Sequence, residues 1–476
     1  KEAFEFVDFL VEAGQSIWQI LPLGPTGYGN CPYSCFSAFA GNPLMINLAQ
    51  LTESGDLKKT DLPAPCPTED VANFASAQEK ILPLLQLASE NFKTTTDSQR
   101  RSNFDNFCRE QAYWLDDYSL YQAMRESQEY RPWQQWPEGF RQRDPAALER
   151  YGQQLQEQIY WHKYLQFVFF EQWTALKQYA NQRGVLIFGD LPIFVAEDSA
   201  DVWANQNYFY LDENGYSTLV AGVPPDYFSA TGQRWGNPLY RWDMMAEDNY
   251  GWWQARFRWN FQLFDLLRVD HFRGFCACWA IPADHPTAEY GEWLAAPGAQ
   301  LFNQLRTELG SLPIIAEDLG IITPDVIQLR DQFNFPGMKI LQFAFDSGAE
   351  NPYLPHNHVP DAVIYTGTHD NNTSLGWWHA LDASGKQRIK DYLKNPCREM
   401  PWPLIGSALG SVSKLAILPM QDILSLPSTS KMNTPGTADG NWRWRMKKDA
   451  YNIDMTERLK NLSHLYGRNL CNTTEM

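Results

Sequence analysis

The sequence LLRVD at residues 266–270 consists of a short apolar run that ends in a carboxylate, and IIAE at residues 314–317 repeats that pattern. Further apolar runs of strand length are SIWQILPL (16–23), VLIFGDL (185–191), MKILQF (338–343), AVIYTGTHD (362–370) and LAILPMQD (415–422). Helical spacing separates them, as in residues 292–310 and 324–333. Strict alternation of strand and helix predicts a parallel sheet, either open or closed into a barrel.

These runs give seven strands, whereas a (β/α)8 barrel of the TIM type needs eight. The chain opens instead on residues 4–13, which have helical spacing. We therefore predict an α/β fold of this barrel type whose first strand is missing from the chain. A missing strand leaves unpaired backbone groups at two edges. We expect a chain extended upstream by that strand and its loop to be more stable and more active, as thermal midpoints and turnover would show.

Changes in composition along the chain predict two insertions into the barrel. Residues 51–150 are polar and rich in helix formers, which indicates a mainly helical subdomain. Residues 204–245 contain Asn214-Gly215 between β-formers, which predicts a hairpin followed by a loop. The barrel is then expected to occupy residues 1–50, 151–203 and 246–476, and the last of these carries the catalytic strands.

Composition excludes several classes of protein. The chain has 476 residues and a formal net charge of −17, which argues against nucleic acid and anionic membranes as partners. No apolar run approaches the ~20 residues that cross a bilayer. The 19 Trp, 22 Tyr and 27 Phe suit a cleft that stacks sugar rings, although a large aromatic core explains them equally well.

The eight cysteines show neither a zinc-site spacing nor the density of a disulfide scaffold. Reduced thiols and a cytoplasmic location are therefore expected. No metal site and no cofactor are predicted. Cys31 and Cys35 lie in one loop, where they are either neutral or a redox-responsive pair.

Charged residues at the ends of the predicted strands are the candidate chemistry. Arg268 and Asp270 are two apart on one strand, so their side chains leave the same face, and the guanidinium is expected to hold the pKa of Asp270 low. Glu317 follows an apolar run that should raise its pKa and keep it protonated. Glycoside chemistry requires such a pair, with about 5–5.5 Å between carboxyl groups in retaining enzymes. The alternative is that Arg268 and Asp270 form a structural ion pair at the mouth of the barrel and take no part in catalysis.

Seven segments together resemble the 4-α-glucanotransferases, also called amylomaltases or disproportionating enzymes, which are relatives of the α-amylase clan. The similarity runs from about Phe4 to Arg445. The segments are LPLGPTGYGNCPYSCFSAFAGNP (21–43), GDLPIFVAEDSADVW (189–203), PPDYFSATGQRWGNPLYRW (224–242), LRVDHFRGF (267–275), IIAEDLG (314–320), YTGTHDNNTS (365–374) and NTPGTADGNWRWR (433–445).

The resemblance implies roles for individual residues. Asp270 matches the nucleophile, Glu317 the acid/base and Asp370 the third carboxylate. The residues implied in substrate binding are Arg268 and His369 at the cleaved sugar, Tyr33 stacking on it, Asp190 and Asp226 lining the cleft, and Gln233 and Trp235 in a loop over the acceptor side.

The activity implied is retaining transfer of an α-1,4-glucan segment to the 4-hydroxyl of glucose or another glucan. An α-amylase-like hydrolase with the same carboxylates is the first alternative, and a glucan-binding protein without catalysis is the second. The location implied is cytoplasmic, or plastid if the source is a photosynthetic eukaryote. Oligomeric state is not predicted.

Overall fold

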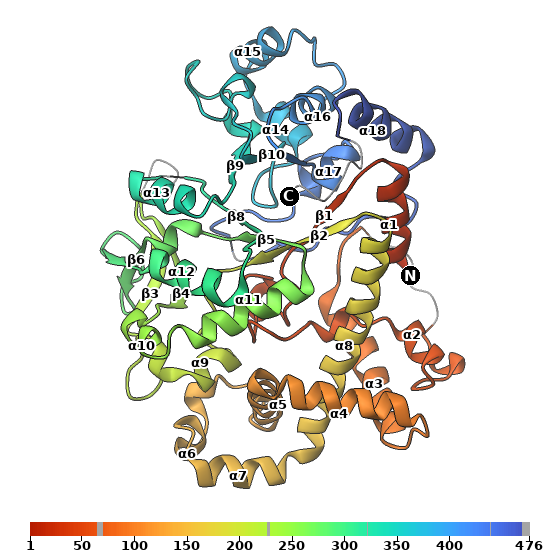
Figure 1. The fold of residues 1–476 in the computed structure, drawn as a ribbon, viewed down its shortest axis with the longest axis vertical. Coiled ribbons are helices and arrows are strands. Elements are labelled where there is room, and N and C mark those ends of the chain that lie inside the picture. Colours follow the sequence, from red (N-terminus) through yellow and green to blue (C-terminus); the bar gives the residue numbers. More distant parts are fainter. Residues whose placement is uncertain (64–69, 226–228, 321, 438, 469–476) are drawn as a thin grey trace.

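The computed structural model describes residues 1–476 except 64–69, 226–228, 321, 438 and 469–476. Seven parallel strands form its centre, as the apolar runs predict (Figure 1). One sheet has the order β1-β2-β5-β8 and the other has the order β11-β10-β9. The strands are β1 (Ile17–Gln19), β2 (Leu186–Leu191), β5 (Leu266–Val269), β8 (Ile314–Ala316), β9 (Gly337–Ile340), β10 (Ala362–Tyr365) and β11 (Leu415–Ile417).

The two sheets meet where the amide N–H of Ala316 donates to the carbonyl of Pro336 at 2.9 Å. The strands therefore follow one another in chain order, which is the arrangement of a (β/α)8-type barrel. Among the described strands, β1 pairs with β2 alone and β11 pairs with β10 alone. The central strands are buried on both faces, and this explains why they read as continuous apolar runs.

Helices cover the outside of these strands. Figure 1 shows α1 and α8 beside β1 and β2, and α11 beside β5. Within the described residues, α8 is the longest helix, with 27 residues. The helices are α1 (Glu2–Glu12), α8 (Gln156–Gln182), α9 (Ala200–Ala204), α10 (Trp242–Glu247), α11 (Gly251–Leu263), α12 (Gly298–Leu309), α13 (Pro324–Gln332), α14 (Ser374–Ala380), α15 (Ala383–Leu393), α16 (Trp402–Leu409), α17 (Met420–Ile423) and α18 (Ile453–Leu465).

A third sheet, which is antiparallel, lies at one side of the barrel and has the order β4-β3-β6-β7. Its strands are β3 (Leu219–Val223), β4 (Gln233–Pro238), β6 (Ala277–Pro282) and β7 (Glu292–Ala295). The sequence did not predict this sheet. The expected helix at 292–310 is wrong in its first part, because residues 292–295 pair with β6 and α12 begins only at Gly298, after Pro297.

The predicted hairpin at Asn214-Gly215 is present. Leu211 and Ser217 form an antiparallel bridge, and the amide of Asp212 donates to the carbonyl of Tyr216 at 2.8 Å. Gly215 has φ +86°, the left-handed conformation that such a turn requires.

Residues 51–150 are mainly helical, and Figure 1 shows most of these helices gathered away from the parallel strands. The helices are α2 (Leu48–Glu53), α3 (Phe74–Lys93), α4 (Ser98–Glu110), α5 (Ala112–Ser127), α6 (Glu138–Arg141) and α7 (Pro145–Gln154). Their aromatic side chains join the main core through α8, as in the contact of Phe104 with Phe167. The boundaries expected for the two insertions and the barrel segments stay predictions.

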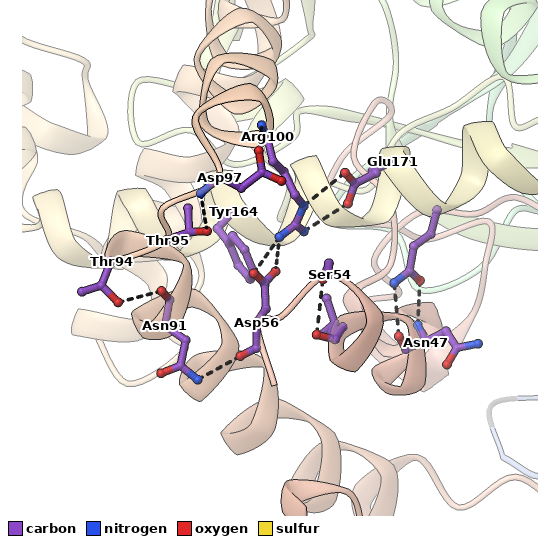
Figure 2. A network of polar contacts seen from close by, with 12 residues as sticks. Asn47, Ser54, Asp56, Asn91, Thr94, Thr95, Asp97, Arg100, Tyr164 and Glu171 are labelled. Atoms are coloured by element: carbon purple, nitrogen blue, oxygen red, sulfur yellow. Dashed lines mark hydrogen bonds and ion pairs between the residues drawn. The ribbon is translucent and has the colours of Figure 1, made fainter. Parts of the chain in front are cut away.

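A buried ion pair ties this helical region to α8 (Figure 2). Nη1 of Arg100 donates to both carboxylate oxygens of Asp56 at 2.6 Å, and the hydroxyl of Tyr164 donates to Asp56 at 2.7 Å. Nη2 of Arg100 reaches Glu171 at 3.1 Å. Asp56 is 1% exposed and Arg100 is 8% exposed. Because water has little access to either charge, the hydrogen bonds and ion pairs with neighbouring side chains must stabilise both.

Asp56→Ala is therefore expected to destabilise the protein by about 3–5 kcal/mol, because it leaves the Arg100 guanidinium buried with less compensation. Chemical denaturation measures the change. Lys414→Ala, which breaks an exposed pair with Asp361, is the matched control and should cost no more than about 1 kcal/mol. Equal losses in the two variants would contradict the expectation.

Candidate active site

Carboxylates stand at or just beyond the ends of neighbouring parallel strands. Asp190 lies in β2, Asp270 follows β5 and Glu317 follows β8. The carboxyl ends of parallel strands lie on one side of the sheet, where barrel enzymes hold their active sites. The register pairs Asp190 with Arg268, so their side chains leave the same face.

Arg268 is the cation at the centre of this group. Its Nη1 donates to Asp190 at 2.6 Å and its Nη2 donates to Asp270 at 2.9 Å. The hydroxyl of Tyr33 also donates to Asp190, at 2.7 Å. Arg268 is only 4% exposed, and the two carboxylates, against the opposing effect of burial, raise its pKa well above the usual value. The guanidinium is therefore permanently charged.

Glu317 has the protonation expected of a general acid. Burial raises its pKa to about 7, the charge of Asp270 adds to that rise, and Arg268 opposes it. The amide N–H groups of His271 and Leu319 donate to the two carboxylate oxygens at 2.7 and 3.0 Å, which fixes the carboxyl plane. A large fraction of Glu317 thus keeps its proton near neutral pH.

The expectation that Arg268 holds the pKa of Asp270 low is wrong. Burial raises that pKa to about 6, and the charges of Asp190 and Asp370 act in the same direction. Arg268 does lower it, but one guanidinium is shared between two carboxylates. Asp270 is still mainly ionised at pH 7, as a nucleophile must be.

Asp370 lies nearby in a different electrostatic setting. Burial would raise its pKa, but His369 and the amide of Asn433, which donates to Oδ1 at 2.6 Å, lower it to about 2. Asp370 is therefore a fixed anion. Sequence analysis missed Asn433, although it is the first residue of the quoted segment NTPGTADGNWRWR.

Aromatic rings line this end of the site. Tyr33 stacks on His369 with ring centroids 5.2 Å apart, and Trp442 lies 5.8 Å from the first ring and 5.7 Å from the second. Trp442 was also missed, since it is distant in sequence from every predicted strand. Three rings beside the carboxylates form a wall of the kind that packs against sugar faces.

Trp235 and His271 form a second aromatic contact beside Glu317. Their rings meet edge to face at 4.8 Å, and Nε1 of Trp235 donates to Gln233 at 3.2 Å. His271 has φ +48°, the left-handed conformation that turns its amide toward Glu317. Asp226 lies outside the described residues.

The structure thus gathers Asp270, Glu317 and Asp370 into one contiguous cluster with six of the seven predicted binding residues. These six are Tyr33, Asp190, Arg268 and His369, together with Trp235, which contacts His271, and Gln233, which accepts a hydrogen bond from Trp235. The separation of about 5–5.5 Å between Asp270 and Glu317 stays a prediction. Cys31 and Cys35, in the loop that carries Tyr33, are free thiols, and their predicted redox role is untested.

Residues 1–451 match the family model described as 4-alpha-glucanotransferase. The chain belongs to this family. The 4-alpha-glucanotransferase of Synechocystis is 49% identical over 99% of this chain and 94% of its own length. That of Thermus thermophilus is 47% identical over 94% of this chain and 90% of its own. The amylomaltase of Streptococcus agalactiae, solved in complex with acarbose, superposes with a TM-score of 0.95 at 38% identity, over 98% of this chain and 95% of that one.

As a 4-alpha-glucanotransferase, the protein is an enzyme that transfers glucan segments. The sequence left three functions open, namely transfer, hydrolysis and binding without catalysis, and the comparisons support transfer. Its fold is that of the amylomaltases. None of the helices in the described ranges is long and apolar enough to span a membrane.

The two raised carboxyl pKa values predict a bell-shaped dependence of kcat/KM on pH. Activity should rise through about pH 6 as Asp270 ionises, and fall through about pH 7 as Glu317 loses its proton. Because the groups interact, the two apparent pKa values belong to the pair. Glucose release from maltotriose measures the profile, and activity that still rises above about pH 9 would rule out Glu317 as the acid.

Proposed function

We propose that this enzyme transfers α-1,4-glucan segments by double displacement, with Asp270 as nucleophile and Glu317 as acid and then base. The main observation that supports this proposal is that two carboxyl groups near Arg268, those of Asp270 and Glu317, differ in protonation. Asp270 contacts the guanidinium at 2.9 Å and is mainly ionised, whereas Glu317 has a pKa raised to about 7. A retaining mechanism needs one ionised and one protonated carboxyl group.

In the first step a carboxylate oxygen of Asp270 forms a bond to the anomeric carbon of the donor glucan. The bond from that carbon to the glycosidic oxygen breaks, and the oxygen takes the proton of Glu317. The reducing-end fragment leaves with a free 4-hydroxyl. The remainder of the donor stays attached to Asp270 as an ester.

In the second step the 4-hydroxyl of glucose or another glucan attacks the same carbon. Glu317, now ionised, takes the hydroxyl proton, and the bond to Asp270 breaks. The new linkage is α-1,4, and the enzyme returns to its starting protonation. Water in place of the acceptor would give hydrolysis, so exclusion of water decides between the two activities.

The surrounding residues have roles in binding. Asp370, held as an anion, and His369 accept or donate hydrogen bonds to adjacent sugar hydroxyls and favour distortion toward an oxocarbenium-like state. Tyr33 stacks on the same sugar. Asp190 positions Arg268. Gln233 and Trp235 cover the acceptor side, and Asp226 is proposed to line the cleft.

The proposed partners are α-1,4-glucan donors together with glucose or maltodextrin acceptors. No nucleic acid or membrane partner is proposed. We also propose a cytoplasmic location, with a plastid as the alternative, since the relative from Solanum tuberosum is named as chloroplastic or amyloplastic.

Incubation with maltotriose tests the activity. Transfer yields glucose and longer chains while the number of reducing ends stays nearly constant. Hydrolysis raises the number of reducing ends, and binding without catalysis does neither. A steady rise in reducing ends that matches glucose release would contradict the proposal.

Glu317→Gln is expected to lower kcat on maltotriose by about 10²–10⁴-fold, because the leaving oxygen is no longer protonated. An α-maltosyl fluoride donor needs no acid, so the same variant should still release fluoride and form an ester on Asp270 that mass spectrometry detects. Asp270→Asn should release none. Glu308→Gln, on the outer helix α12, is the control. Normal transfer between natural glucans by Glu317→Gln would refute the assignment.

A further inference from the structure

Two tryptophans differ from all the others in their exposure. All 19 tryptophans lie in the described residues, and the most exposed are Trp235 at 39% and Trp293 at 44%. Both belong to the antiparallel sheet β4-β3-β6-β7, one on each edge strand. Trp235 lies against His271 beside the catalytic carboxyls. The proposed mechanism gives no role to Trp293.

Two neighbours hold Trp293 in place. Across the strand pair it lies opposite Trp279, with ring centroids 5.3 Å apart in an edge-to-face contact. In addition, Cζ of Arg273 lies over the Trp293 ring, 4.1 Å from its centroid. An exposed indole fixed by two contacts loses little conformational freedom when a ligand stacks on it, which favours binding.

The surroundings of Trp293 suit a neutral polyhydroxylated chain. In the same hairpin, Tyr290 is 72% exposed. Ala295, two residues further along β7, lies on the same face as Trp293 and lines a shallow groove of about 370 Å³ with Asp243 and Gln300. Aromatic faces and nearby carboxylate and amide groups are the groups that contact the apolar faces and hydroxyls of sugars. The net charge of −17 disfavours an anionic occupant.

Arg273 connects this surface to the active site. It lies in the turn three residues after Asp270, and its Nη1 donates at 3.0 Å to Thr323 in the segment that follows Glu317. Figure 1 shows β3, β4 and β6 at the side of the barrel, close to α12 and α13. Arg273 thus links Trp293 to the segments that follow Asp270 and Glu317.

We propose that Trp293, Tyr290 and the groove beyond Ala295 form a second binding site for α-1,4-glucan, separate from the catalytic cleft. This inference rests on the proposed function for the class of its ligand, an α-1,4-glucan. It goes beyond that function by placing a second site for this ligand at Trp293. A long glucan held there stays close to the cleft between successive transfers. Short oligosaccharides bind in the cleft alone and gain nothing from the second site.

The test compares long and short substrates in the full-length enzyme. Trp293→Ala should weaken retention in affinity electrophoresis through amylose and should raise KM for amylose as donor, each by about three- to tenfold, as loss of one aromatic contact predicts. Both kcat and KM on maltotriose should stay within about twofold of the wild type. Trp293→Tyr, which keeps a ring, should restore most of the retention.

Tyr130→Ala is the matched control. Tyr130 is 61% exposed and also has an arginine over its ring, Cζ of Arg125 at 5.4 Å, but it lies in the helical insertion. Its loss should change neither readout. Thermal midpoints establish that each variant is folded, and sedimentation measures its oligomeric state.

Three results would overturn the inference. The first is retention of amylose by Trp293→Ala equal to that of the wild type. The second is a rise in KM for maltotriose as large as that for amylose, which would place Trp293 in the cleft. The third is a change in oligomeric state, which would make the surface a contact between two copies. Maltotriose turnover by the unaltered enzyme tests the proposed function separately. Failure of the second-site proposal would therefore not imply failure of the proposed function.

Discussion

The buried guanidinium of Arg268 is the interaction on which the site depends. It joins two strands, because Asp190 belongs to β2 and Arg268 to β5, and it joins both to Asp270. It also fixes the loop that carries Tyr33, whose hydroxyl shares Asp190. A cation that is only 4% exposed is tolerated because several polar groups surround it. A shift in the register of β2 and β5 would separate Arg268 from Asp190 and leave both charges uncompensated.

A single cation among several carboxylates explains why their protonation differs. Asp190 and Asp270 contact Arg268 directly, whereas Glu317 has no ion pair within the described part of the chain and accepts hydrogen bonds from two backbone amides. Burial raises the pKa of Glu317 to about 7, while separate partners, His369 and Asn433, keep Asp370 ionised. A mainly ionised Asp270, a largely protonated Glu317 and a fixed anion at Asp370 thus arise from different neighbours of chemically similar groups.

Much of this architecture could be predicted from the sequence, because parallel strands buried on both faces are continuous apolar runs. The carboxylates at their ends were expected to lie together, and the structure brings Asp190, Asp270 and Glu317 close to Arg268. The antiparallel sheet escaped prediction because β7 is a four-residue edge strand, EWLA, whose pattern also fits a helix. Asn433 and Trp442 were missed because their positions depend on a long connection back to the site. The pKa of Asp270 was misjudged because burial raises it, and because the sharing of Arg268 with Asp190 on β2 cannot be read from β5 alone.

The antiparallel sheet shows how a barrel adds recognition without altering the chemistry at its strand ends. Its edge strand β4 brings Trp235 to the cleft, where the ring contacts His271 next to Glu317. Its other edge, β7, places Trp293 against Arg273 and Trp279 at the surface. In a polymer-processing enzyme the reacting bond occupies only a few sugar units, and the remaining units need a surface of their own. Because β4 and β7 are the two edges of one sheet, the fold sets the position of Trp293 relative to Trp235 and its neighbour His271. A glucan held at the proposed second site would therefore lie at a distance from Asp270 and Glu317 that the fold determines.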